Sequence, residues 1–96
     1  MKRAYELAII LRLDPNEQVM RDAIDQVQQW IEGGDNGTVK KIDHWGRRKL
    51  AYEIDKQREG YYLIMDVDIE AAHIVELERN LKLSNDIIRY LLVRPD

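Results

Sequence analysis

Residues 50–67 read L-A-Y-E-I-D-K-Q-R-E-G-Y-Y-L-I-M-D-V, two apolar runs on either side of a polar segment. Apolar side chains alternate in residues 50–54 and again in residues 61–67, with the period of two that is typical of a β-strand. The polar segment between them, residues 55–60, predicts a turn. The centre of the chain therefore consists of two successive strands joined as a hairpin.

The N-terminal part of the chain predicts a strand followed by a helix. Residues 5–11 alternate as in a half-buried strand. Asp14 then supplies a helix N-cap, with Pro15 at the first helical position and Glu17 three residues after the cap, as in a capping box. The Gly33-Gly34 pair ends the helix, because glycine readily adopts the left-handed conformation. The apolar residues of this helix fall on one stripe: Val19, Met20, Ala23, Ile24, Val27, Trp30 and Ile31.

The remaining segments predict a strand before the central turn, and a helix and a strand after it. A strand begins near Thr38, where Val39 and Ile42 are three apart and indicate a bulge or a twist. Residues 69–83 return to helical spacing, and residues 87–93 form a last strand that is rich in β-branched side chains. The expected buried stripe of the second helix contains Ala71, Ile74, Leu77 and Leu81.

The order strand, helix, strand, strand, helix, strand is that of an α+β, ferredoxin-like split βαβ domain. Right-handed crossovers put both helices on one face of a four-stranded antiparallel sheet. We expect residues 1–96 to form a single domain of this kind. The other face of the sheet then has no helical cover, and its mixture of side chains is apolar enough to favour contact with a partner. A partner protein is expected on this face, at Glu6, Ala8, Ile10, Tyr62 and Ile64.

The composition is that of a folded chain with a slightly acidic balance. Its 96 residues are 45% hydrophobic, which suffices for one core, and the net charge is −3. An acidic total argues against wholesale coating of nucleic acid but is compatible with a local basic patch. The chain has no cysteine, so it has neither disulfides nor a thiolate metal site, and a reducing cytoplasm is the default. The apolar run near the N-terminus is too short to span a bilayer.

A basic cluster, Arg47, Arg48 and Lys49, follows Gly46 near the central turn. The segment 40–58 carries seven cations against three anions, a local charge of +4. Guanidinium groups match phosphate oxygens in bidentate geometry, which favours nucleic-acid contact. The alternative is a solvated strand edge whose charges discourage aggregation. The residues alone leave both interpretations open, and the wider charge balance slightly favours phosphate contact.

A second group of cations lies near the two termini, at Lys2, Arg3, Arg89 and Arg94. The first and last strands are neighbours in the predicted sheet, so these residues could together form a second basic edge. Singly, each is more often an ordinary surface charge. Arg89 is in the middle of an otherwise apolar strand and therefore needs water, a carboxylate or a phosphate as a partner.

The aromatic residues give weaker indications. Tyr61 and Tyr62 suggest base stacking, but the residues around them match the RNA recognition motif poorly. The parity of Tyr61 with its apolar neighbours predicts a core position instead. Trp30 and Trp45 are expected to be packing residues.

The sequence contains no recognisable catalytic or metal-binding constellation. His44 and His73 are isolated and are expected at the surface. Asp66 and Asp68 flank one strand residue but lack the loop of a cation site. Ser84 is the only serine, and neither a phosphate-binding loop nor a nucleophile elbow is present. We therefore expect no catalytic activity, cofactor, metal or small-molecule substrate.

Residues 46–54, G-R-R-K-L-A-Y-E-I, resemble the signature of the bacterial small-subunit ribosomal protein S-six family. Lys49 stands where the family more usually has arginine or glutamine, and Glu53 replaces a common proline, which weakens the local positive field. The family's order of strands and helices is the one inferred above. The likeness extends over nearly the whole chain and includes Tyr5-Glu6, Trp45, Lys56, Gly60-Tyr61-Tyr62 and Ile88-Arg89.

This resemblance implies a structural, non-enzymatic protein of the cytoplasmic small ribosomal subunit. It further implies pairing with ribosomal protein S-eighteen and binding to the central domain of small-subunit (16S) rRNA by a chain that is a monomer when free. Because an acidic domain binds RNA poorly alone, a basic partner on the open face would supply the missing charge. The alternatives are a protein-only or regulatory domain that dimerises through its open face, and an independent single-strand RNA binder. The residues expected to contact RNA are Lys2, Arg3, Arg47, Arg48, Lys49, Lys56, Arg89 and Arg94.

Overall fold

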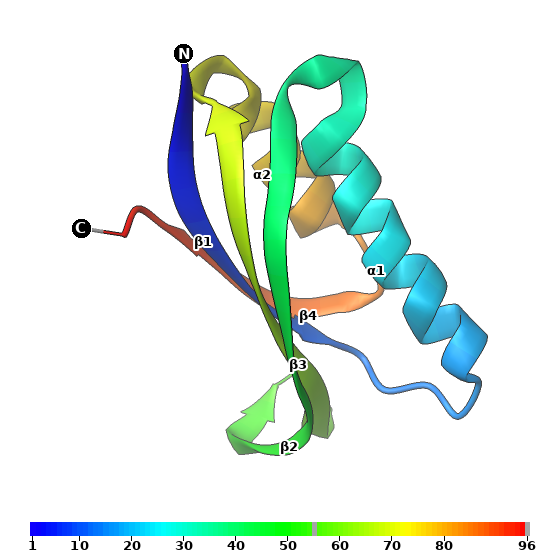
Figure 1. Cartoon of the computed structure of the whole chain (residues 1–96). Coiled ribbons are helices and arrows are strands. Elements are labelled where there is room, and N and C mark those ends of the chain that lie inside the picture. Colours follow the sequence, from blue (N-terminus) through cyan, green and yellow to red (C-terminus); the bar gives the residue numbers. More distant parts are fainter. Residues whose placement is uncertain (55, 96) are drawn as a thin grey trace.

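The computed structural model describes residues 1–54 and 56–95, and its elements follow the predicted order (Figure 1). The predicted turn begins at Asp55, which lies outside the described residues. The strands are β1 (Lys2–Leu11), β2 (Gly37–Ile54), β3 (Gln57–Glu70) and β4 (Ile87–Val93). The helices are α1 (Glu17–Glu32) and α2 (Ile74–Leu83), with short 3-10 turns η1 (Gly33–Asp35) after α1 and η2 (Ala71–His73) before α2.

The strands form one four-stranded antiparallel sheet in the order β2-β3-β1-β4. Figure 1 shows both helices on the same side of this sheet. β1 lies between β3 and β4, so Leu7 has Met65 on one side and Leu92 on the other. This arrangement confirms the prediction of an α+β, ferredoxin-like split βαβ fold.

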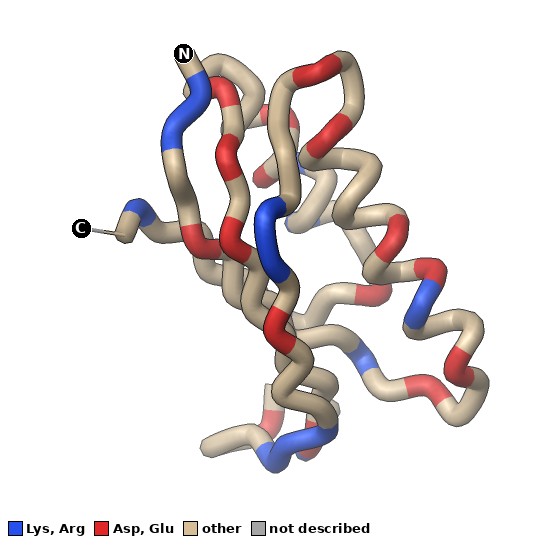
Figure 2. Tube along the Cα trace, viewed as in Figure 1, with Lys and Arg blue, Asp and Glu red and all other residues tan. Residues whose placement is uncertain are grey.

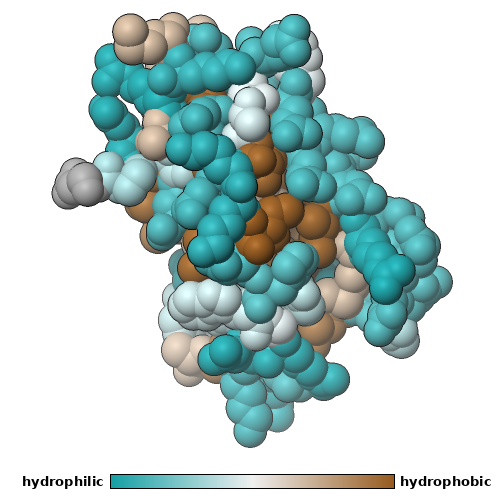
Figure 3. Space-filling model, viewed as in Figure 1, coloured by the Kyte–Doolittle hydropathy of each residue, from teal (hydrophilic) through white to brown (hydrophobic). Residues whose placement is uncertain are grey.

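The hydrophobic core lies between the sheet and the two helices. Odd-numbered residues of β1 and β3 point toward the helices, and both Leu7 and Met65 are 0% exposed. Figure 3 shows hydrophobic side chains filling the space between β2 and α1, with hydrophilic residues around them. The helices bury one stripe each against the sheet: Ala23, Val27 and Ile31 from α1, and Leu77 and Leu81 from α2. The packing that stabilises the fold is thus on one face, and the opposite face is left for other contacts.

α1 begins later than the sequence predicted. Asn16, not Asp14, is the N-cap, and its Oδ1 accepts a hydrogen bond of 2.9 Å from the backbone N–H two residues further on. Asp14 instead accepts from the N–H of Asn16 at 2.8 Å, a local turn that competes with capping. Val19, in the first turn of α1, remains 41% exposed rather than joining the buried stripe. The helix ends at the predicted glycine pair, where Gly34 has φ +66°.

α2 also begins later than predicted, because β3 is longer. Ile69 belongs to β3, where it is 0% exposed and opposite Arg3 of β1. Ala71 lies in η2 and is exposed, so its predicted place in the buried stripe is wrong. An apolar residue such as Ile69 fits both the strand period and the helical period at such a junction, which is why the spacing misplaced the boundary. The last strand has the predicted bounds, residues 87–93.

β2 is irregular, as the spacing of Val39 and Ile42 predicted. Its pairing with β3 shifts register just after Val39, again after His44 and again after Lys49. Such shifts bend a strand and increase its twist. Figure 1 shows the outer ends of β2 and β3 curving away from the rest of the sheet. This outer part, residues 47–59, is called the basic hairpin below.

Candidate partner and nucleic-acid interface

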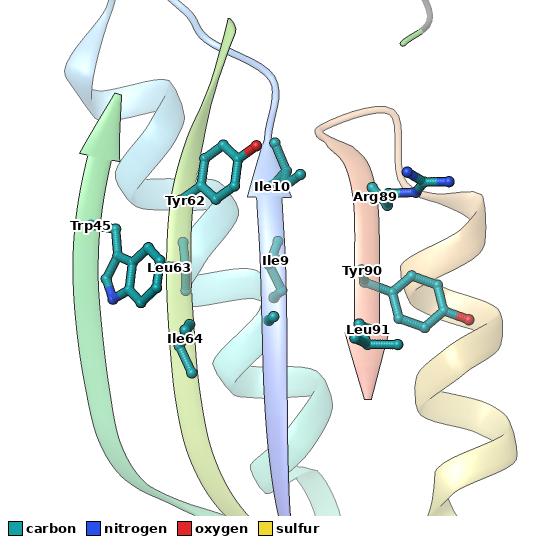
Figure 4. Close-up of a pocket in the computed structure, with 10 residues that line it drawn as sticks. Ile9, Ile10, Trp45, Tyr62, Leu63, Ile64, Arg89, Tyr90 and Leu91 are labelled. Atoms are coloured by element: carbon teal, nitrogen blue, oxygen red, sulfur yellow. The ribbon is translucent and has the colours of Figure 1, made fainter. Parts of the chain in front are cut away.

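The face of the sheet opposite the helices carries a mainly apolar hollow of about 540 Å³. All four strands contribute side chains to it, and the helices lie behind the sheet (Figure 4). Ala8, Ile10, Tyr62 and Ile64, which were predicted for the partner face, line the hollow and are half-buried. They occupy even positions of β1 and β3, so strand alternation turns them away from the core. The structure therefore brings these predicted residues together.

Two large exposed side chains that the sequence analysis did not assign to this face complete the hollow. Trp45 of β2 is 51% exposed, and Leu91 of β4 is 61% exposed. The prediction that Trp45 is a packing residue is wrong. Ile42 and His44 are opposite Met65 and Leu63 of the covered face, so strand alternation puts Trp45 on the open face, beside Tyr62. The parity of Leu91 with Arg89, and that of Trp45 with Asp43, could have identified both residues from sequence.

The open face is acidic beyond the hollow, at the end away from the basic hairpin. Glu6, the remaining predicted partner-face residue, lies directly opposite Asp66, and Asp68 and Glu70 continue the series along β3 (Figure 2). Lys40 Nζ lies 3.5 Å from Asp68 Oδ2, and the N-terminal amine lies 2.7 Å from Glu70 Oε2. Like charges directly opposite each other in a sheet are unfavourable. Within this acidic stripe, Glu6, Asp66, Asp68 and Glu70, the repulsion is between Glu6 and Asp66, and a positively charged group lying against them would relieve it.

The first arginine of the basic hairpin is already paired. Arg47 donates from Nε to Glu59 Oε1 at 3.1 Å and from Nη2 to Glu59 Oε2 at 2.9 Å. The hydrogen bond from Arg47, together with its charge, lowers the pKa of the Glu59 carboxyl, and the same pairing raises the pKa of Arg47. Because the pair is accessible to water, a phosphate can compete with Glu59 for the guanidinium.

Arg48 connects the basic hairpin to the hollow. Its guanidinium carbon lies 5.7 Å from the centre of the Trp45 ring, and its Nε donates to the Trp45 carbonyl oxygen at 3.3 Å. Lys49 and Lys56 are exposed on the same hairpin. The predicted cations of this segment thus gather at one end of the sheet (Figure 2). Arg48 there lies against Trp45, which lines the hollow.

Arg89 has an aromatic partner rather than a carboxylate. Its Nη1 donates to the hydroxyl of Tyr52 at 2.6 Å, and its guanidinium carbon lies 5.8 Å from the centre of the Tyr52 ring. Arg89 is on β4, opposite Ile10, whereas Tyr52 is in the basic hairpin and is 60% exposed. The sequence analysis did not single out Tyr52 as a site residue, since no local pattern links two residues so far apart in the chain.

The other predicted RNA-binding cations lie far from the basic hairpin. Lys2 and Arg3 begin β1, and Arg94 directly follows β4. The basic hairpin begins beside Leu11, at the other end of β1. At ~3.3 Å per strand residue, the hairpin and the start of β1 are about 30 Å apart. Arg89 is at the hairpin end of the sheet, so the structure separates it from the predicted second basic edge.

The two histidines differ in their surroundings. His44 is exposed, as predicted, and its Nδ1 lies 2.9 Å from the hydroxyl of Tyr61. The surface prediction for His73 is wrong, because its side chain is only 11% exposed and its Nε2 lies 2.7 Å from the carbonyl oxygen of Trp30 near the end of α1. Trp30 and Tyr61 pack against the core, as predicted.

Two further properties concern the chain as a whole. Among the residues described by the structure, no three His, Asp or Glu side chains are grouped so as to hold a metal ion. Within the same residues, no helix combines the length and the apolar character needed to cross a membrane.

Comparison with known proteins identifies the family. A family model described as ribosomal protein S6 matches residues 4–94. The small ribosomal subunit protein bS6 of Acidothermus cellulolyticus is 44% identical over 94 residues, covering 98% of this chain and 97% of that protein. Its counterpart in Carboxydothermus hydrogenoformans is 40% identical over 96 residues, covering 100% and 99%.

A solved structure agrees with these relatives. The crystal structure of 30S ribosomal protein S6 from Thermotoga maritima matches with a TM-score of 0.90 and 29% identity, over 99% of this chain and 89% of that one. The sequence matches cover nearly the full length of this chain and of each relative. The aligned region therefore includes the residues of the hollow, the acidic stripe and the basic hairpin. The chain therefore belongs to the ribosomal protein S6 family, whose members are structural proteins of the small ribosomal subunit rather than enzymes.

Proposed function

We propose that this chain binds small-subunit rRNA, in the central domain, together with ribosomal protein S-eighteen, which docks on the open sheet face. One observation carries this proposal. The only sheet face without a helix in the described structure holds an apolar hollow between an acidic stripe and a basic hairpin. A protein that covers this face would meet all three surfaces at once.

The hollow supports docking of a protein partner. Trp45 and Leu91 expose large apolar side chains to water, and their burial is favourable by about 25 cal/mol per Å² of apolar surface. Exposed tryptophan at the centre of a contact surface is a frequent source of binding energy. The acidic stripe beside the hollow favours a partner with a basic segment, because opposite charges across an interface guide association and set its register.

The charge distribution supports a composite RNA surface. The chain has a net charge of −3, and Arg47 is neutralised by Glu59. The isolated protein therefore presents a weak positive field to RNA, whose affinity for proteins depends on cations that displace phosphate counterions. Arg48 lies against Trp45, so a basic partner seated on the hollow would bring its own cations beside those of the basic hairpin.

The eight predicted cations would contribute unequally to this surface. Arg47, Arg48, Lys49 and Lys56 form one contact, at the hairpin end of the sheet. Lys2 and Arg3 would reach RNA only as a separate contact, because the start of β1 is about 30 Å from the hairpin at ~3.3 Å per residue. Arg94 follows Val93, which is opposite Glu6, so it too lies away from the hairpin, at about 20 Å by the same spacing. Arg89 is engaged by Tyr52 and is considered below.

Filter binding to an RNA fragment of the central domain tests the proposal, with the chain alone, S-eighteen alone and both together. We expect tight binding at physiological salt only with both proteins. Replacing Arg48 by Gln should weaken that binding and flatten its log-log salt dependence by about 0.7 to 0.9 units. Arg21→Gln on α1, an exposed arginine paired with Glu17 at 3.6 Å, is the matched control and should leave the slope unchanged.

Two results would contradict the proposal. Tight binding by the chain alone would mean that no partner is needed, as expected for an independent single-strand RNA binder. Absence of binding with both proteins, combined with a homodimer of this chain, would favour the protein-only interaction domain.

A further inference from the structure

The basic hairpin extends beyond the strands that would otherwise support it. Arg47 is opposite Tyr61, which is itself opposite Leu11, the last residue of β1. β4 also begins at this level, with Ile87 opposite Leu11. The part of β2 and β3 beyond Arg47 therefore has no neighbouring strand in the sheet, and Figure 1 shows it curving away at the lower end.

Two glycines form the corner at which the hairpin leaves the sheet. Gly46 has φ +81°, a left-handed conformation that side chains other than glycine rarely adopt. Gly60, opposite Arg48, passes so close to β1 that a Cβ atom there would be 2.4 Å from Cγ2 of Ile10. Both positions therefore require glycine, and the hairpin leaves the sheet at this corner.

In the outer part of the hairpin, β2 has more residues than β3, and Tyr52 is one of the extra residues. Between the pairs Lys49–Glu59 and Ile54–Gln57, residues 50–53 of β2 face only Arg58 of β3. This excess length bows out from the pairing, and Tyr52 lies in the middle of it. From there its hydroxyl accepts the 2.6 Å hydrogen bond from Arg89 on β4, the edge strand farthest from β2.

We propose that Tyr52 and Arg89 are positioning residues that hold the basic hairpin against the end of the open face, next to the hollow. Arg89 also lines the hollow, so the contact joins the outer hairpin to the surface on which the partner docks. This inference rests on the proposed function. Its consequence is pre-organisation, because a hairpin already fixed in place loses less conformational freedom when RNA and partner bind.

The proposal assigns Arg89 a role other than phosphate contact. Its guanidinium donates one hydrogen bond to the hydroxyl of Tyr52 and lies over the Tyr52 ring, so its removal releases the outer hairpin. Loss of Tyr52 changes no formal charge, so it should weaken RNA binding without changing the salt dependence. Loss of a phosphate ligand would instead flatten the log-log salt slope by about 0.7 to 0.9 units.

Amide hydrogen exchange on the isolated chain tests the contact without RNA or partner. Tyr52→Ala and Arg89→Ala should each speed exchange of the amides of residues 47–54 and 56–59 by about three- to tenfold, as loss of one solvent-exposed hydrogen bond of ordinary strength implies. Tyr52→Phe, which keeps the ring over the cation, should have a smaller effect. The double variant should exchange no faster than either single one, because both remove the same contact.

Leu91→Ala is the matched control. Leu91 is on β4, two residues from Arg89, is 61% exposed and lines the same hollow. Its aliphatic side chain can form neither the hydrogen bond nor the cation–π contact that Arg89 makes with Tyr52. Its replacement should leave exchange in the hairpin unchanged. Unchanged exchange in both Tyr52→Ala and Arg89→Ala would overturn the proposed contact.

RNA binding by the pair of proteins tests the positioning role. Tyr52→Ala and Arg89→Ala should weaken binding by about the factor seen in hydrogen exchange, with an unchanged salt slope. A loosened hairpin with undiminished affinity would overturn the positioning role, and a flatter slope for Arg89→Ala would make Arg89 a phosphate ligand instead. If the unmodified pair does not bind RNA, the proposed function fails, whereas the exchange result still decides whether the contact exists.

Discussion

The two faces of the sheet differ although they share every strand. On β3, Leu63 and Met65 point toward the helices and are 1% and 0% exposed, whereas Ile64 between them points to the open face and is only half-buried. The covered face holds a closed apolar core. The open face combines an apolar hollow with charged ends, a combination that fold stability does not require. We infer that the side chains on one face of each strand stabilise the fold, whereas those on the other face are available for binding.

The largest predicted effect compares one leucine from each face. Leu63→Ala, in the core, should lower the free energy of unfolding by about 2–5 kcal/mol, because it leaves a cavity that neighbouring helices fill only partly. Leu91→Ala, on the open face and 61% exposed, should change it by about 0.5 kcal/mol or less. Urea denaturation measures both. Equal losses would show that the open face is as much a part of the core as the covered one.

The second prediction compares the same two faces by their contribution to partner binding, where the open face should have the larger effect. Replacing Trp45 and Leu91 together by Ala should weaken the affinity for S-eighteen by at least about tenfold, because a buried tryptophan anchor is worth about 2 kcal/mol or more. Stability of the isolated chain should barely change. Titration calorimetry measures the affinity, and Val75→Ala on α2, which is 68% exposed, is the control. Equal weakening by Val75→Ala would show that the partner does not dock specifically on the open face.

A third prediction concerns a polar contact on the covered side. His73→Phe should lower the free energy of unfolding by about 1–2 kcal/mol, because the carbonyl of Trp30 loses its 2.7 Å partner at the end of α1. His73→Gln, which can still donate to this carbonyl, should lose less. Thermal denaturation compares the two. A phenylalanine variant as stable as the unmodified protein would show that the contact is not needed to hold η2 against α1.

The smallest predicted effect lies in the basic hairpin. Since Arg47 lowers the pKa of Glu59 below its ordinary value of 4.5, their pairing stabilises the folded state above that pH. This contribution to folding stability is fully present at neutral pH and is lost as the pH falls through the lowered pKa of Glu59 in the folded state. An NMR titration of the Glu59 carboxyl should show this low pKa, and Arg47→Gln should return it toward 4.5. Identical titrations in both proteins would contradict the pairing.

Much of the fold followed from residue spacing, and the exceptions have physical causes. The periods of two and 3.6 identified all four strands and both helices, since each element buries one face. The cap of α1 was misplaced because Asp14 and Asn16 can both cap, and only the folded backbone decides between them. His73 was misjudged because its partner, the Trp30 carbonyl, is distant in sequence.

The candidate site was predictable to a similar degree. Strand parity identified four residues of the hollow, and the resemblance to the ribosomal family, with its place on the small subunit, is confirmed by the comparisons. Trp45 was misassigned although it follows His44, which is opposite Leu63 of the covered face, so that alternation puts Trp45 on the open face. The contact between Tyr52 and Arg89 depends on the bend of a hairpin, which residue spacing does not encode. The predicted assignment of cations to RNA remains a prediction.

The most direct test of the account is to map the partner onto this chain by NMR. The chain is labelled with ¹⁵N and titrated with unlabelled S-eighteen while its amide signals are followed. We predict that the signals that shift most belong to the open face, at Ala8, Ile10, Trp45, Ile64 and Leu91, with little change on the outer faces of α1 and α2. Shifts concentrated on the helices, with the open-face signals unmoved, would contradict the account.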